Sequence, residues 1–352
     1  MRRLPSGVFA ESYARDGALI RTRKQWLALL IFLAALVLAP LALGPRFVGI
    51  GNNVFIMAVV VTGLQLTLGF AGQVNLAQAG FMGVGAFAAG SLANHFAIPF
   101  LLILPLAGCA AALFGLLFGL VAVRIKGFYM ALTTITAQFV FHFAVINLPV
   151  RWFGAANGLK VSAAQVFGLS FVNEIQLYYL NGLVCACMIA FALGIARGRF
   201  GRAFIAVRDD DVAAGMMGID IVRTKALAFV VGAFYAGIGG ALWAYYIRFV
   251  SVDQFTLFSS IWMIAMLIVG GVGSIVGGLI GVVVIVGLQE FVTTLGPVVA
   301  DYVPDLGGQI VFAGMNVLLG LLLALFLILE PKGLMHRWEL VKHGIRIWPF
   351  PY

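Results

Sequence analysis

Apolar stretches of about 20 residues recur along most of the chain, from residue 26 to residue 329, and a helix of that length spans the hydrocarbon core of a bilayer. Only helices and closed barrels satisfy their backbone hydrogen bonds in lipid, and barrel strands would alternate apolar and polar residues. These runs do not alternate. With 63% hydrophobic and 10% charged residues, the chain is predicted to be an all-α, polytopic transmembrane helical bundle.

We expect roughly ten membrane segments, or as few as about eight, with some of them broken or re-entrant. Two are short, 79–94 and 259–271, and each of these either spans or re-enters the membrane. The first run is too long for a signal-peptide core, and we expect it to be a retained helix. The predicted segments lie at about 26–44, 50–70, 79–94, 98–123, 127–147, 177–196, 226–247, 259–271, 275–295 and 309–329.

The lysines and arginines indicate the direction of the segments. If the N-terminus is cytoplasmic and all ten segments cross, all but four of the 22 lysines and arginines face the cytoplasm. Cytoplasmic loops carry such an excess, so we expect cytoplasmic tails at 1–25 and 330–352 around a membrane domain at 26–329. The net charge of +9 then meets anionic lipid and implies no nucleic-acid partner. The four exceptions are Arg46, Arg151, Lys160 and Arg248.

No phosphate-binding glycine loop, zinc motif or nucleophile motif occurs in the sequence. Cys109, Cys185 and Cys187 lie within apolar runs, where cysteine behaves as a small buried hydrophobe. The four histidines do not have the spacing of metal ligands. We therefore expect no cofactor, no metal site and no catalytic residue in this chain, which argues against a membrane-bound enzyme.

The longest connection that this topology places in the cytoplasm is 197–225. Its three consecutive aspartates precede a run of small and methionine residues, and carboxylates suit the N-terminus of a helix. We predict a short helix over 210–218 that Gly218 ends. A methionine-rich cluster there favours docking of a partner over a loop that only orients the chain. The residues assigned to docking are Arg208, Asp209, Asp210, Asp211, Ala213, Ala214, Met217 and Gly218.

Two polar or glycine-rich interruptions indicate a pathway through the membrane. The stretch GFAGQVNLAQAGF places three side-chain amides between apolar segments, so it forms either a broken helix or an ordinary cytoplasmic turn. A glycine cluster over 270–281 lies in the other half of the chain. Paired interruptions of this kind point to a transport pathway, although close helix packing also explains single glycines. The candidate pathway residues are Gln73, Asn75, Gln78, Thr134, Gln138, Gly271, Gly273 and Ser274.

Glu290 is the one acid placed inside a predicted span. A charge in the middle of a bilayer costs about 2.5 kcal/mol or more, so we expect this carboxylate to face a partner or water. A simple polar contact is favoured over a proton relay.

Several stretches resemble one family of membrane proteins. VAAGMMG (212–218) has the Ala-Ala-x-x-x-Gly spacing of the loop by which permeases of ABC importers contact their ATPases. LGFAGQVNLAQAGFMGVGAF (68–87), RIKGFYMALTTITAQF (124–139) and IVGGVGSIVGGLIG (268–281) are similar to branched-chain amino acid permeases of the LivM type. The resemblance covers most of residues 60–285.

The resemblance has departures. Val212 stands where many permeases have Glu, and Asn75 and Ala77 stand where Ser and Gly are usual. In the outer loop, Phe153 and Ala155 replace Thr and Gly. Because relatives of this fold carry urea, short amides or sugars, the resemblance leaves the substrate open.

The resemblance implies a permease subunit of an importer in the bacterial inner membrane, for branched-chain or similar amino acids. Its partners would be cytoplasmic ABC ATPase subunits, a homologous or identical second permease, and an extracytoplasmic substrate-binding protein. ATP hydrolysis would take place in the ATPase. The alternative from another class is a self-sufficient secondary transporter or channel for a small polar solute.

Overall fold

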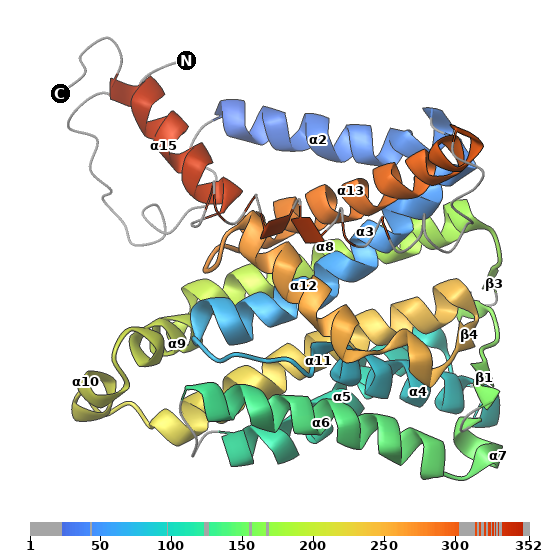
Figure 1. Cartoon of the computed structure of the whole chain (residues 1–352), viewed down its shortest axis with the longest axis horizontal. Coiled ribbons are helices and arrows are strands. Elements are labelled where there is room, and N and C mark those ends of the chain that lie inside the picture. Colours follow the sequence, from blue (N-terminus) through green and yellow to red (C-terminus); the bar gives the residue numbers. More distant parts are fainter. Residues whose placement is uncertain are drawn as a thin grey trace.

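The computed structural model describes residues 23–302, apart from 43, 97, 123–126, 155–156 and 167–168, and then 333–347 with isolated positions between 314 and 330. These residues are mostly helical (Figure 1), which confirms the predicted all-α polytopic fold. The helices are α2 (Arg23–Ala42), α3 (Pro45–Leu64), η1 (Gln65–Phe70), α4 (Gln78–Phe96), α5 (Phe100–Ala122), α6 (Phe128–Asn147), α7 (Val150–Phe153), α8 (Glu174–Arg197), α9 (Arg199–Asp209), α10 (Asp211–Met216), α11 (Ile221–Ile247), η3 (Val252–Gln254), α12 (Leu257–Gly270), α13 (Ile275–Tyr302) and α15 (Leu334–Ile347).

The predicted membrane segments correspond to observed helices. Each of the first nine predicted segments coincides with a helix, and the tenth, 309–329, lies largely outside the described residues. Within the described part of the chain, 7 helical stretches are long and apolar enough to cross a membrane. In α2 the apolar part, Trp26–Ala42, is shorter than these stretches, and α4 is not among them. The seven stretches are Pro45–Phe70, Phe100–Val121, Tyr129–Asn147, Glu174–Arg197, Ile221–Ile247, Val252–Gly270 and Ile275–Thr294.

Helix α11 lies at the centre of the bundle and packs most extensively against α5, α4 and α3. Its crossing with α4 depends on small residues. A β-carbon on Gly240 would lie 1.9 Å from the Met82 carbonyl oxygen, and one on Gly85 would lie 2.2 Å from the Gly237 carbonyl oxygen. In lipid, helices associate through such close backbone packing because there is no hydrophobic force between them.

The helices run between two ends of the molecule. Figure 1 shows α9 and α10 together at its left end, and α7 with the short strands at the opposite end. We call these the α9–α10 end and the strand end. At the strand end two antiparallel pairs form, with Leu159 opposite Val250 and Ala164 opposite Phe171. The strands are β1 (Leu159–Lys160), β2 (Ala164–Val166), β3 (Leu169–Phe171) and β4 (Phe249–Val250).

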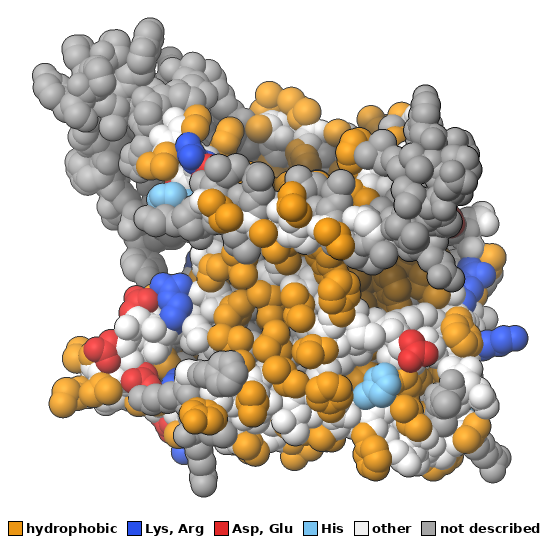
Figure 2. All heavy atoms as spheres, in the orientation of Figure 1, with side chains coloured by type: hydrophobic (Ala, Val, Ile, Leu, Met, Phe, Trp, Pro, Cys, Tyr) orange, Lys and Arg blue, Asp and Glu red, His pale blue; other side chains and the backbone are white. Residues whose placement is uncertain are grey.

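The surface agrees with a membrane protein. Figure 2 shows apolar side chains across the middle of the visible face, while charged side chains gather around α9 and α10 at one edge and lysines or arginines at the other. Exposed side chains on the long helices include Leu113, Phe143 and Leu183, each more than 60% exposed. Apolar exposure of this extent suits contact with lipid.

Candidate docking face and translocation pathway

The connection 197–225 folds into two helices rather than one. Helix α9 buries Gly201, Phe204 and Val207, which recur at helical spacing. The sequence prediction missed this helix because it treated the residues before Asp209 as loop, although the apolar spacing was readable. Gly198 separates α9 from α8 in an extended conformation.

The predicted helix over 210–218 is present as α10. The Asp210 carboxylate accepts hydrogen bonds from the backbone N–H groups of Val212 and Ala213, at 2.9 and 3.1 Å, and thereby caps the free N-terminal donors. At the other end, Gly218 has a φ of +84°, and the Ile219 N–H donates to the Ala214 carbonyl. Gly218 thus ends the helix as predicted, in a backbone conformation that favours glycine.

Helix α10 presents apolar side chains to solvent. Val212 is 62% exposed, Met216 86% and Met217 83%, whereas Ala214 is buried at 5%. Of the residues predicted to dock, Met217 and Ala213 are therefore on the outer face, and Ala214 packs inward. Two exposed methionines on one short helix form an adaptable contact surface.

The second part of this connection is fixed to α11. Asp211 and Lys225 form an ion pair of 3.3 Å with side chains only 20% and 13% exposed. The Asp220 carboxylate caps α11 by accepting from the Arg223 N–H at 3.0 Å. The ion pair joins α10 to α11, and the Asp220 cap fixes the start of α11 itself.

The polar stretch after α3 is a helix break. Helix α3 continues as a π-helix, η1, and residues 71–77 are then non-helical before α4 begins. Gln73, Asn75 and Gln78 are buried. The Asn75 amide donates to the Gln78 side-chain oxygen at 2.8 Å, and the Gln78 amide donates to the Val60 carbonyl at 3.0 Å. Of the two predicted alternatives, the broken helix is observed.

Side chains from other helices cap the start of α4. The Ala79 N–H donates to the Ser260 hydroxyl at 2.9 Å, and the Gly80 N–H donates to the Gln138 side-chain oxygen at 2.7 Å. Just before the helix, the Leu76 N–H donates to the Thr134 hydroxyl at 3.1 Å. The first N–H groups of any helix lack partners within it, so these contacts allow α4 to begin inside the bundle. Thr134 and Gln138 were predicted as pathway residues, and Ser260 was not.

The glycine-rich link between α12 and α13 packs against the first break. Gly271 and Gly273 have positive φ values of 122° and 88°. The Gln65 amide donates to the Gly271 carbonyl at 3.2 Å, and a β-carbon on Gly69 would lie 2.9 Å from the Gly273 nitrogen. Ser274 accepts from the Gly277 N–H at 3.2 Å. The two interruptions predicted from separate halves of the chain are therefore adjacent.

Two cavities lie beside these breaks. One, of about 360 Å³, is lined by residues that include Gly72, Gln73, Arg208 and Lys225. The other, of about 460 Å³, is lined by the 271–274 link and by residues of α15. Gln73 is 1% exposed, and in the described part of the chain neither its amide nitrogen nor its oxygen has a hydrogen-bond partner. Within the described residues, no three His, Cys, Asp or Glu side chains group as metal ligands.

Comparison with known proteins agrees with this architecture. Residues 46–329 match the family model described as the permease component of branched-chain amino acid transport systems. The chain belongs to this permease family. Membership makes it a multi-pass membrane protein of a transport system rather than an enzyme.

Individual relatives of this permease carry different solutes. It is 27% identical to the high-affinity branched-chain amino acid permease LivM of Salmonella typhimurium and to that of Escherichia coli, over 92% of this chain and 77% of each relative. It is also 30% identical to the L-arabinose permease AraH of Escherichia coli, over 36% of this chain and 37% of that protein. No solved structure matches it.

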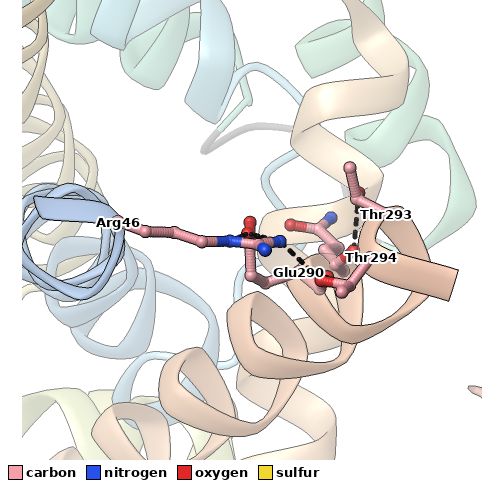
Figure 3. Close-up of polar contacts among 5 residues, drawn as sticks. Arg46, Glu290, Thr293 and Thr294 are labelled. Carbon is pink, nitrogen blue, oxygen red and sulfur yellow. Dashed lines mark hydrogen bonds and ion pairs between the residues drawn. The ribbon is translucent and has the colours of Figure 1, made fainter. Parts of the chain in front are cut away.

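The permease pairs Glu290 with an arginine at the start of α3. The Arg46 guanidinium lies 2.6 Å from the Glu290 carboxylate and also donates to the Thr294 hydroxyl (Figure 3). The Arg46 side chain is 56% exposed and the Glu290 side chain 34%. Arg46 is at the end of α3 opposite η1, and η1 packs against α9. The pair therefore lies towards the strand end, and of the two expected surroundings for Glu290, a partner or water, the structure contains a partner.

Glu290→Gln is expected to change little in the permease. Half-exposed ion pairs contribute about 0 to 1 kcal/mol to stability. A simple polar contact between Glu290 and Arg46 also requires no transfer of a proton during transport. We expect the variant to keep the wild-type rate of transport and its dependence on pH, measured as solute uptake by proteoliposomes. Uptake that loses its pH dependence in Glu290→Gln would instead support proton coupling through Glu290.

Proposed function

We propose that this permease is the membrane-spanning subunit of an ATP-driven importer for branched-chain or similar amino acids. It pairs with a homologous or identical second permease, two cytoplasmic ABC ATPases and an extracytoplasmic binding protein that delivers the substrate. Both of its termini face the cytoplasm, and so does the α9–α10 end. The similarity to LivM along 92% of the chain supports the substrate class.

The observation that carries this proposal is the form of α10. Its cap and its ion pair to the base of α11 fix the helix, while Met216 and Met217 remain almost fully exposed. Scattered exposed apolar residues are common on soluble surfaces, but an apolar helix face held in place at a charged end suits a groove in a partner. A self-sufficient transporter has no need of such a face.

In this proposal, ATP binding and release move the ATPases, and α10 transmits the movement to α11 and the helix breaks. Translocation then consists of switching between two states, one open to the outside and one to the cytoplasm. The buried amides at the first break and the glycine-rich link after α12 lie beside the pathway. This chain supplies access for the solute, and the ATPase supplies the chemistry.

Met216→Asp and Met217→Asp test the docking face. Both side chains point into solvent, so the permease is expected to insert and fold normally while the charge is buried without a partner in the ATPase groove, a cost of several kcal/mol. We expect the ATPase to be lost when the tagged permease is purified, and substrate-stimulated ATP hydrolysis to fall to background.

The matched control is Leu340→Asp, because Leu340 is 54% exposed on α15 and lies outside α10. This variant is expected to retain the ATPase. If the two methionine variants bind the ATPase and import labelled leucine at the wild-type rate, α10 is only an orienting loop and the importer proposal fails.

A further inference from the structure

Arg208, in the last turn of α9, has a side chain that is 36% exposed and that also reaches the helix break after η1. Its Nη1 donates to the Gly69 carbonyl at 2.8 Å, and its Nε and Nη2 donate to one carboxylate oxygen of Asp209 at 3.1 and 3.0 Å. The Gly69 carbonyl lies in the last turn of η1, where helix carbonyls carry a partial negative charge. A charged donor at that position makes a strong hydrogen bond.

The same side chain lies against both helix breaks. A β-carbon on Gly72, which has a φ of +67°, would lie 2.6 Å from the Arg208 Cγ. A β-carbon on Gly273 would lie 3.3 Å from its Nη1. Both glycines therefore leave room for the arginine. Arg208 is thus in contact with the link after η1 and with the link after α12. Its own helix, α9, leads directly into α10.

The cavity of about 360 Å³ places Arg208 beside an unsatisfied polar group. Gln73 and Arg208 both line this cavity, and both polar atoms of the buried Gln73 amide lack partners among the residues that the structure describes. Buried amides without partners are rare in folded proteins and indicate contact with water or a polar solute. The cavity is therefore a polar space that lies between the docking helices and the first break.

We infer that Arg208 is the positioning residue that couples the docking helices to the inner mouth of the pathway. Displacement of α9 and α10 pulls on the Gly69 carbonyl through the guanidinium, and this shifts residues 69–73 and changes the access of Gln73 to the cytoplasm. The inference rests on the proposed function, because the displacement originates in the ATPase. It gives Arg208, whose side chain is 36% exposed, a coupling role in place of the docking role predicted from the sequence.

The reporter for this movement is a cysteine at position 73. The native Cys109, Cys185 and Cys187 are replaced by alanine, and Gln73→Cys is introduced into the permease assembled with its ATPase. A small, positively charged thiosulfonate reagent is added from the cytoplasmic side, without nucleotide and after trapping with ATP and vanadate. With Arg208 present, the labelling rate is expected to differ between the two states.

Arg208→Ala is expected to make labelling the same in both states while the ATPase stays bound. Transport should fall roughly tenfold or more, as expected for the loss of a hydrogen bond to a charged group, and ATP hydrolysis should continue without stimulation by substrate. Arg208→Lys keeps the positive charge but has one donor nitrogen in place of three, so it cannot bond Gly69 and Asp209 in the same geometry. We expect it to recover transport in part. The control is Arg202→Ala, because Arg202 is also on α9 and donates to the Arg197 carbonyl next to its own helix, at 3.2 Å.

Three results would overturn the inference. State-dependent labelling and normal transport in Arg208→Ala would show that the arginine does not couple the two regions. Loss of the ATPase from Arg208→Ala, with Arg202→Ala still bound, would return Arg208 to the docking surface. Labelling that does not change with nucleotide even with Arg208 intact would overturn this inference alone if the permease still imports leucine with its ATPase, whereas a permease that imports leucine without any ATPase would reject the proposed function, so the two failures are distinguishable.

Discussion

Alanine at Gly240 is expected to prevent the permease from reaching its native packing. In a helix interior, replacing glycine by alanine ordinarily favours folding by about 1 kcal/mol. At Gly240 the added β-carbon would lie 1.9 Å from the Met82 carbonyl oxygen and 2.9 Å from the Ala86 nitrogen. Both are backbone atoms of α4, so no side-chain rotation relieves the contact. The steric cost, about 1 to 3 kcal/mol or more for overpacking, exceeds the gain.

The measurement is the thermal unfolding of the permease in detergent, together with the fraction that remains monodisperse. Gly194→Ala is the matched control, because Gly194 is also in a long helix and a β-carbon on it would meet no neighbouring group within 4 Å. We expect the control to be as stable as the wild type or slightly more stable. Equal stability of the two variants would show that α4 and α11 cross with more room than the structure indicates.

Gln138→Leu is expected to destabilise the start of α4. The Gln138 side chain accepts from the Gly80 N–H at 2.7 Å and donates to the Phe255 carbonyl at 2.6 Å, and it is buried. Leucine has a similar volume but leaves the Gly80 N–H and the Phe255 carbonyl without a partner. Each unpaired buried group lowers the stability by about 1 to 3 kcal/mol. We expect a lower unfolding temperature and a large loss of transport, because the first break is no longer held in place.

Thr136→Val is the control on the same helix. Thr136 is exposed, and its hydroxyl donates only to the Leu132 carbonyl of α6, so its loss leaves no other helix without a partner. Unfolding temperature and uptake of labelled substrate are measured for both variants in parallel. Should Gln138→Leu match Thr136→Val in both, the capping of α4 by α6 has no energetic importance.

The features predicted well from sequence are those that depend on neighbours in the chain. The apolar runs, the Asp210 cap and the stop at Gly218 are local, and the structure contains each of them. The contact between the two interruptions was not predicted, and their role in a pathway stays a prediction. The assignment of α10 to docking stays a prediction.

Other features depend on how distant segments pack. Sequence reasoning grouped Arg208 and Ala214 with the docking residues, but it did not predict that Arg208 donates to the Gly69 carbonyl or that Ala214 is buried. Ser260 gave no signal, because a serine in an apolar helix can bond to its own backbone. The pairing of Arg46 with Glu290 joins residues 244 positions apart, and no local pattern predicts such a partner.

The capping of α4 has a consequence for how the protein is made. The Ala79 N–H depends on a hydroxyl that lies 181 residues further along the chain, and the Gly80 N–H depends on a side chain 58 residues further along. During synthesis, the first helices leave the ribosome long before Ser260 exists. Water or the insertion machinery must hold the unpaired N–H groups of α4 until then, so this helix takes its final place in the membrane only after α12 has been translated.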